Sequence, residues 1–118
     1  MDEKLILKDI LTIIDDLKYG ESISIEDLIK SLNWEEEEIL KVVSVATKFY
    51  ILIIDSRAYY DGKIEKHTRI TGIDRDGHII FDLLKNPELM KQVIKEFPAL
   101  EECSIFTVAT LMRKCFWY

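Results

Sequence analysis

The two histidines, His67 and His78, are the side chains of this sequence best suited to acid–base chemistry or to binding a metal ion. A metal site needs further ligands at characteristic spacings, such as Cys-x-x-Cys or His-x-x-x-His, and neither histidine has such a neighbour. His67 falls in a segment predicted to be a strand, and His78 falls at the start of a predicted helix. We therefore interpret both as structural or surface residues. The sequence predicts no metal and no cofactor.

Four consecutive glutamates, Glu35 to Glu38, form the densest group of charges in the sequence. Successive residues of a helix point about 100° apart, so four in a row do not converge on one cation. Negative charge is favourable in the first turn of a helix, and the run is typical of a solvated helix start. The serines lack a G-x-S-x-G motif, and the four glycines form no phosphate-binding loop. The sequence thus indicates that the protein is not an enzyme and has no catalytic residues.

Length and composition predict one cytoplasmic domain. The 118 residues suffice for a single core, and no apolar run approaches the ~20 residues of a membrane span. The acidic N-terminus lacks the basic region of a signal peptide. Cys103 and Cys115 lie twelve residues apart in a stretch predicted to be helical, too far apart for a disulfide, so we expect free thiols in a reducing compartment.

The charge is unevenly distributed along the chain. Residues 1–40 carry 12 acidic and 4 basic side chains, a balance of −8, whereas residues 41–118 carry 10 acidic and 12 basic side chains, a balance of +2. An acidic N-terminal part and a mildly basic remainder are the main compositional asymmetry of the chain.

The N-terminal half has the apolar spacing of three helices. Gly20 is a predicted helix end, because glycine readily takes the left-handed conformation. Ser24, with Asp27 three residues later, and Asn33, with Glu36 three residues later, are predicted N-caps. The three predicted helices span residues 2–18, 25–32 and 34–49.

A β-hairpin is predicted after these helices. The β-branched run Ile51–Ile54 indicates one strand, and residues 64–73 indicate the returning strand. Ile64, Thr68 and Ile70 are expected on one face of that strand, with His67 and Arg69 on the other. The segment Tyr60–Lys63 contains Asp-Gly, a strong signal for the connecting turn. Three helices followed by a hairpin predict an α+β winged helix-turn-helix, with the hairpin as its wing.

The remainder of the chain, residues 74–118, is predicted to add C-terminal helices to this domain of residues 1–73. Asp74 is a predicted N-cap for a helix that ends near Lys85, and Asn86-Pro87 restarts a second one. Pro98 ends that helix, and Ser104 opens a last helix that runs toward Tyr118. We expect residues 1–118 to form one winged-helix domain with this extension.

The segment Gly77-His78-Ile79-Ile80-Phe81-Asp82 resembles the G-H-x-F-L-D signature of a family of small uncharacterised phage and prophage proteins. The resemblance extends back over Glu38–Leu52 and forward to Ser104-Ile105-Phe106. It differs at Tyr50, where the family usually has glycine. The resemblance implies a winged-helix fold and an origin in a mobile element, and it carries no function.

Nucleic-acid binding is one hypothesis, because helix-turn-helix proteins place their second helix in the major groove. Four glutamates at the start of that helix would repel phosphates, and the pI of about 4.9 lacks the usual basic character. The wing is the better candidate, since its basic side chains exceed its acidic ones by two and two tyrosines are available to stack. The candidate residues for double-stranded DNA are Lys41, Ser44, Thr47, Lys48, Arg57, Tyr59, Tyr60, Lys63, Lys66 and Arg69.

The last helix is apolar on more than one side and ends in three aromatic residues, a composition enriched at interfaces. We expect it to form half of a homodimer interface, although packing within one molecule is the alternative. The candidate interface residues are Ile105, Phe106, Leu111, Met112, Phe116 and Trp117.

Two functions therefore remain open. The leading hypothesis is a small DNA-binding regulatory or accessory protein of a mobile element, acting as a dimer. The alternative is a protein-interaction module whose acidic helices bind a basic protein partner and do not bind DNA. The basic wing favours the first hypothesis, and the glutamates of the third helix favour the second.

Overall fold

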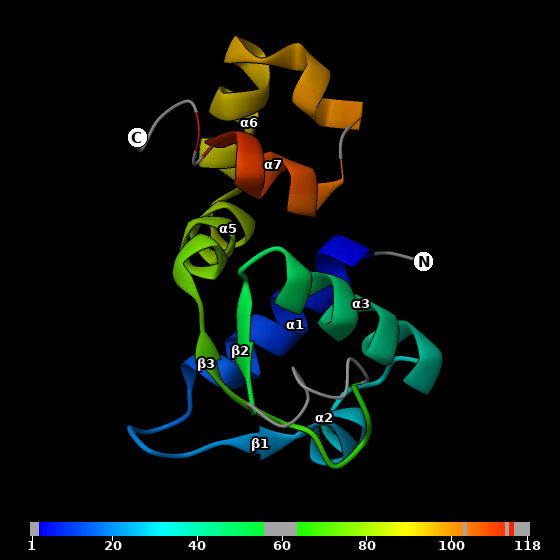
Figure 1. Cartoon of the computed structure of the whole chain (residues 1–118). Coiled ribbons are helices and arrows are strands. Elements are labelled where there is room, and N and C mark those ends of the chain that lie inside the picture. Colours follow the sequence, from blue (N-terminus) through cyan, green and yellow to red (C-terminus); the bar gives the residue numbers. More distant parts are fainter. Residues whose placement is uncertain (1–2, 56–63, 103, 113, 115–118) are drawn as a thin grey trace.

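The computed structural model describes residues 3–55, 64–102, 104–112 and 114, and it is α+β, as the sequence predicts (Figure 1). Helices dominate, and three short strands form one sheet. The elements in chain order are α1 (Glu3–Asp15), β1 (Ile23–Ser24), α2 (Ile25–Ser31), α3 (Glu36–Lys48), β2 (Leu52–Ile54), β3 (Arg69–Ile73), α5 (Arg75–Lys85), α6 (Pro87–Glu96), the 3-10 helix η1 (Pro98–Glu102) and α7 (Ile105–Met112).

The sheet is antiparallel with the strand order β1-β3-β2. The predicted hairpin is confirmed, because Leu52 pairs with Ile73 and Ile53 pairs with Gly72. The strand β1 was not predicted. It pairs Ile23 with Ile70, and at two residues it is too short to show an alternating pattern.

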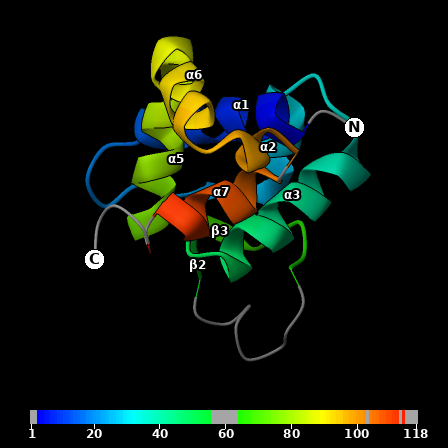
Figure 2. The same ribbon diagram turned by 90° about the horizontal axis from the view of Figure 1, so that it is seen from above.

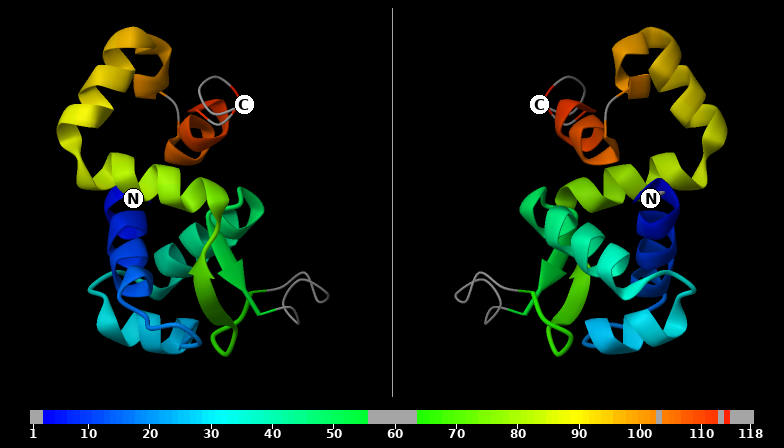
Figure 3. Two further views of the ribbon diagram at one scale, coloured as in Figure 1. Left: turned by 90° about the vertical axis from the view of Figure 1, so that its left-hand side faces the viewer. Right: turned by 90° about the vertical axis from the view of Figure 1, so that its right-hand side faces the viewer.

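One apolar core joins the helices to the sheet. The face of α3 predicted from its spacing is buried, and so is a matching stripe of α1. In Figures 1 and 3, α1, α2, α3 and the sheet make up one end of the molecule. Helix α5 lies across the middle, and α6, η1 and α7 make up the other end. The fully buried side chains include Ile6, Leu7, Ile10, Leu11, Ile25, Leu28, Ile39, Ile51, Leu52, Ile70, Ile80 and Leu83.

Four of the predicted helix starts are confirmed by side-chain capping. The Ser24 hydroxyl accepts the N–H of Asp27 at 3.1 Å. The Asp74 carboxylate accepts the N–H of Arg75 at 2.8 Å, and the Asn86 carbonyl oxygen accepts that of Leu89 at 3.2 Å. The Ser104 hydroxyl accepts the N–H of Phe106 at 3.2 Å. Each cap satisfies a backbone donor that the helix itself leaves without a partner.

Two helix boundaries differ from the prediction. Helix α1 ends at Asp15 rather than residue 18, because the next two N–H groups bond to carbonyls only three residues back and tighten the last turn. The N-cap of α3 is Glu35, not Asn33, and its side chain makes no capping hydrogen bond. Trp34 lies just outside the helix, where its indole N–H donates to the Asp9 carboxylate of α1 at 2.8 Å.

The returning strand also begins later than predicted, at Arg69 rather than Ile64. A turn occupies residues 65–68, in which the N–H of Thr68 donates to the Glu65 carbonyl at 3.0 Å. The hydroxyl of Thr68 accepts the N–H of Glu65 at 3.1 Å, which closes the same turn from the side chain. The predicted turn at residues 60–63 lies outside the described residues.

Candidate interaction surface

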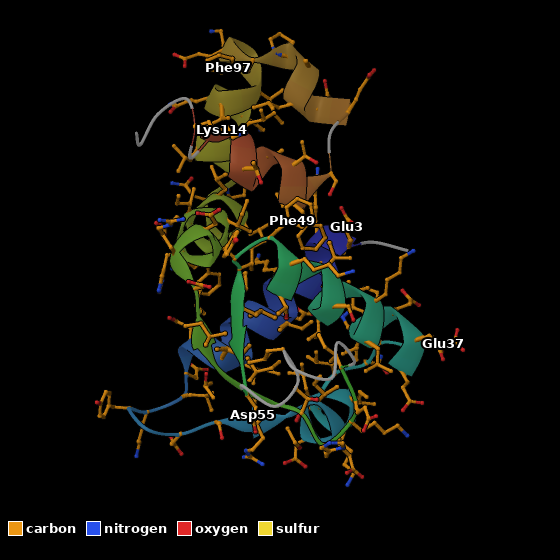
Figure 4. The ribbon with its side chains drawn as sticks, viewed as in Figure 1. Glu3, Glu37, Phe49, Asp55, Phe97 and Lys114 are labelled. Atoms are coloured by element: carbon orange, nitrogen blue, oxygen red, sulfur yellow. The ribbon has the colours of Figure 1, made fainter. Side chains whose placement is uncertain are left out.

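Helix α3 presents one face to the core and the other to solvent. Its buried side packs against α1 and β2. Figures 1 and 4 show that its N-terminal end projects from the body of the molecule, with Glu37 at its outer edge. Whatever binds this helix therefore meets its first turn, as well as the exposed Lys41 and Lys48 farther along.

The four candidate DNA-contacting residues of α3 are not equivalent. Lys41 and Lys48 are exposed, and with the half-buried Ser44 they follow the spacing i, i+3, i+7 of one helix side. Thr47 is half-buried, and its hydroxyl donates to the carbonyl of Val43 at 2.9 Å. The structure thus places Lys41, Ser44 and Lys48 in one row and commits the Thr47 hydroxyl to the helix backbone.

The candidate residues of the segment from Arg57 to Arg69 divide into two groups. Arg57, Tyr59, Tyr60 and Lys63 lie outside the described residues. Lys66 and Arg69 are described, and both make contacts within the protein.

Lys66 forms an ion pair with Glu36 at the start of α3. This pair joins the segment before β3 to the third helix, and the two charges offset one another. Exposed pairs of this kind contribute only about 0–1 kcal/mol to stability, but they reduce the charge available to a ligand.

Arg69 holds the chain just before β1. Its Nε donates to the Ser22 hydroxyl at 2.7 Å, and its Nη2 donates to the Ser22 carbonyl at 2.9 Å. These residues lie 47 positions apart in the sequence, so no local pattern indicates the contact. The guanidinium that was expected to contact phosphate is therefore already occupied on two of its nitrogens.

Acidic side chains follow the end of α1, the α1–β1 connection, α2 and the start of α3, which in Figure 1 run from the lower left along the bottom to the right-hand side. Among the exposed residues of these segments, only Lys18 and Lys30 are basic, and Lys30 lies 3.6 Å from Glu26. We call this the acidic surface. Its exposed members are Asp15, Asp16, Glu21, Glu26, Asp27, Glu35 and Glu37.

The predicted dimer residues do not form one exposed patch on the described part of the chain. Ile105 and Phe106 are buried within the protomer, at 0% and 3% exposure, so they are not available to a second copy. The ring of Phe106 lies 5.9 Å from that of Phe49, at the C-terminal end of α3. Leu111 is 37% exposed, whereas the Met112 side chain, Phe116 and Trp117 lie outside the described residues.

The histidines lie apart from one another and from any cluster of ligands. His67 is exposed, with its Nδ1 3.2 Å from a carboxylate oxygen of Glu65, and His78 is exposed on α5. Within residues 3–55, 64–102, 104–112 and 114, no group of three or more histidine, cysteine or acidic side chains is placed to hold a metal ion. None of the helices in these residues has the length and apolarity to cross a bilayer.

Comparison of the chain with protein-family models, curated proteins and solved structures finds no match. Function must therefore be argued from the surface itself. That surface includes the fully exposed Tyr19 between α1 and β1, which is not among the residues predicted from the sequence. The Tyr-Gly pair that predicts a helix end also indicates a tight turn, and this is the sequence signal for an exposed side chain here.

Proposed function

We propose that this chain is a winged-helix domain that binds a macromolecular partner and has no catalytic role. The order α1-β1-α2-α3-β2-β3, with a three-stranded antiparallel sheet, supports the fold. In this assignment α2 and α3 form the helix-turn-helix, and the segment between β2 and β3 is the wing. We also propose an origin in a mobile element, which rests on the resemblance to the phage and prophage family. A cytoplasmic location is proposed from the composition.

The partner that we propose is a protein with a basic surface. The observation that carries this proposal is the excess of negative charge at the start of α3. Glu35 and Glu37 are exposed there, while the nearby Lys66 is paired with Glu36. DNA-binding proteins gain affinity by releasing cations from phosphates, and an excess of carboxylates works against that gain. A partner rich in lysine or arginine would instead be attracted, and charge complementarity would raise its association rate.

A photoreactive amino acid introduced in place of Glu37 tests the proposal in the cells that naturally contain the protein. We expect a discrete protein adduct, and we expect it to disappear when Glu26 and Glu35 are both replaced by glutamine. The control places the same photoreactive group at Glu101, an exposed acidic position in η1 at the other end of the molecule. The same adducts from positions 37 and 101, or none from either, would contradict the proposal.

Duplex DNA is a second candidate partner, favoured by the row on α3 in which the exposed Lys41 and Lys48 flank the half-buried Ser44. Each phosphate contact made by a lysine would contribute roughly −0.9 to the slope of log K against log salt concentration. Replacing Lys41 and Lys48 by glutamine should then abolish retardation of duplex DNA at low salt. Replacing Lys91 and Lys95 of α6, which are also exposed, is the matched control. Absence of retardation by the unmodified protein would exclude this candidate.

A further inference from the structure

The connection between α1 and β1 contains a well-defined turn. The N–H of Glu21 donates to the Lys18 carbonyl at 2.9 Å, and Gly20 has φ +86°. A hydrogen bond between the first and fourth residues, with glycine at a positive φ in third place, is typical of a type II turn. The Glu21 carboxylate also accepts the N–H of Lys18 at 2.6 Å, so the turn is closed from both sides.

The end of this turn is fixed to the sheet. Ser22 follows the turn directly and is held by the two hydrogen bonds from Arg69 of β3. Ile23 then pairs with Ile70 in the sheet. The backbone of the turn is thus restrained on the β1 side by contacts with a strand distant in sequence.

Tyr19 occupies the second position of the turn, and its relative exposure is 107%. A tyrosine ring carries a large apolar area, and folded proteins usually bury part of it. Here the turn and its anchor hold the ring away from the rest of the chain. Because the backbone is already ordered, a partner that receives this ring does not have to bear the entropy cost of ordering the loop.

The charges beside Tyr19 indicate what kind of partner fits. Asp15 at the end of α1 and Asp16 and Glu21 of the connection are exposed, and they outnumber the two bases beside them, Lys18 and the Arg69 that holds Ser22. Phosphates would be repelled here, which disfavours stacking of Tyr19 on a nucleobase. An apolar pocket lined at its rim by lysine or arginine side chains would match both the ring and the surrounding carboxylates.

We infer that Tyr19 is the anchoring side chain through which the acidic surface engages its basic protein partner. This inference rests on the proposed function, and it adds a specific contact to it. Interface hot spots are enriched in tyrosine, and truncating one to alanine typically weakens binding by about 30-fold or more.

The experiment uses full-length protein with a photoreactive amino acid at Lys18, which leaves Tyr19 in place. We expect position 18 to yield the same protein adduct as position 37, and we expect Tyr19→Ala to remove the adduct at position 18. Calorimetric titration of the protein identified in that adduct should show binding about 30-fold weaker for Tyr19→Ala, and within about threefold of the unmodified protein for Tyr19→Phe.

Two further variants separate the ring from its presentation. Gly20→Ala keeps Tyr19 but places a side chain at a strained φ, and it should weaken binding by about three- to tenfold. Tyr50→Ala removes an exposed tyrosine that follows the C-terminal end of α3 and should leave binding unchanged. Circular dichroism of each variant establishes that the fold is retained.

The outcomes distinguish the inference from the proposed function. An adduct from position 37 alone, or Tyr19→Ala binding as tightly as the unmodified protein, overturns the role of Tyr19 and leaves the proposed function intact. Absence of a specific adduct from either position overturns both. Crosslinking of position 18 to nucleic acid overturns the inference in favour of a different class of partner.

Discussion

Gly77 and Tyr50 lie where α3, β2 and α5 meet, and each shows how a single position controls this fold. The N–H of Asp74 donates to the Ile51 carbonyl at 2.8 Å, and that of Asp76 donates to the Tyr50 carbonyl at 3.1 Å. These bonds satisfy N–H groups at the start of α5 and draw its backbone against the start of β2. The close approach gives a physical reason for Gly77, the first residue of the signature segment.

Gly77→Ala should lower the free energy of unfolding by about 3 kcal/mol or more. An added Cβ would lie 2.2 Å from the Ile51 carbonyl oxygen and 2.6 Å from Cγ2 of Ile73, and the carbonyl is backbone that cannot turn aside. Urea denaturation measures the loss. The control is Gly72→Ala, whose Cβ would meet Ile53 at an ordinary 3.8 Å, and it should change stability by less than about 1 kcal/mol. Equal effects of the two variants would contradict this account.

Tyr50 has φ 59°, a left-handed conformation that glycine adopts without strain. We expect Tyr50→Gly to be more stable than Tyr50→Ala by about 1 kcal/mol, because both lack the ring and only alanine keeps the Cβ that crowds this backbone. Thermal unfolding of the two variants makes the comparison, in which contacts of the tyrosine ring cancel. A more stable alanine variant would show that the left-handed backbone is not strained.

At the scale of elements, α2 is held at its start by three hydrogen bonds. Ser24 caps it locally, and the N–H groups of Ile25 and Glu26 donate to the carbonyls of Thr68 and Lys66 at 3.0 and 2.9 Å. The turn at residues 65–68 therefore supports α2 as well as the sheet. A helix of seven residues is marginal alone, so these contacts decide whether it forms.

Ser24→Ala should cost about 1 kcal/mol of stability, the usual effect of losing an N-cap. Asn33→Ala is the matched control, because Asn33 precedes α3 without capping it. We expect that control to change stability by less than about 0.5 kcal/mol, measured by denaturant unfolding. A larger loss at Asn33 than at Ser24 would restore the sequence-based assignment of the α3 cap.

At the scale of the whole molecule, the C-terminal helices form an end distinct from the acidic surface. Figure 2, viewed from above, shows α6 and α7 over the domain, and α7 packs mainly on α5. The buried Ile105, Phe106 and Val108 make its inner face part of the common core. A dimer formed through α7 would therefore have to use its outer face, where Leu111 is exposed.

If the protein is a homodimer through α7, Leu111→Lys should halve the molar mass measured by light scattering at high micromolar concentration, with little change in stability. Charge placed in an apolar interface opposes its formation. Phe106→Ala should instead destabilise the fold by about 3–5 kcal/mol, because it leaves a cavity in the core. A monomeric unmodified protein would contradict the proposed dimer.

Elements whose causes are local can be predicted from the amino-acid sequence alone. Apolar side chains at helical spacing, and caps such as Ser24 and Asp74, act within one or two turns of chain, so they can be read without knowing the fold. The strand pair β2–β3 was predictable for the same reason, from two short β-branched segments on either side of a turn signal. The clustering of acidic residues in the first 40 positions also appeared in the sequence.

Which of the candidate basic side chains are available to a ligand depends on contacts between distant parts of the chain. Lys66 and Arg69 look like available cations in the sequence, but Glu36 and Ser22, 30 and 47 residues away, engage them. Likewise β1 exists because β3 offers a partner, and Phe106 is buried because the fold brings Phe49 beside it. Each of these outcomes depends on which distant segments become neighbours, and that arrangement is fixed by burial of the whole core rather than by local spacing.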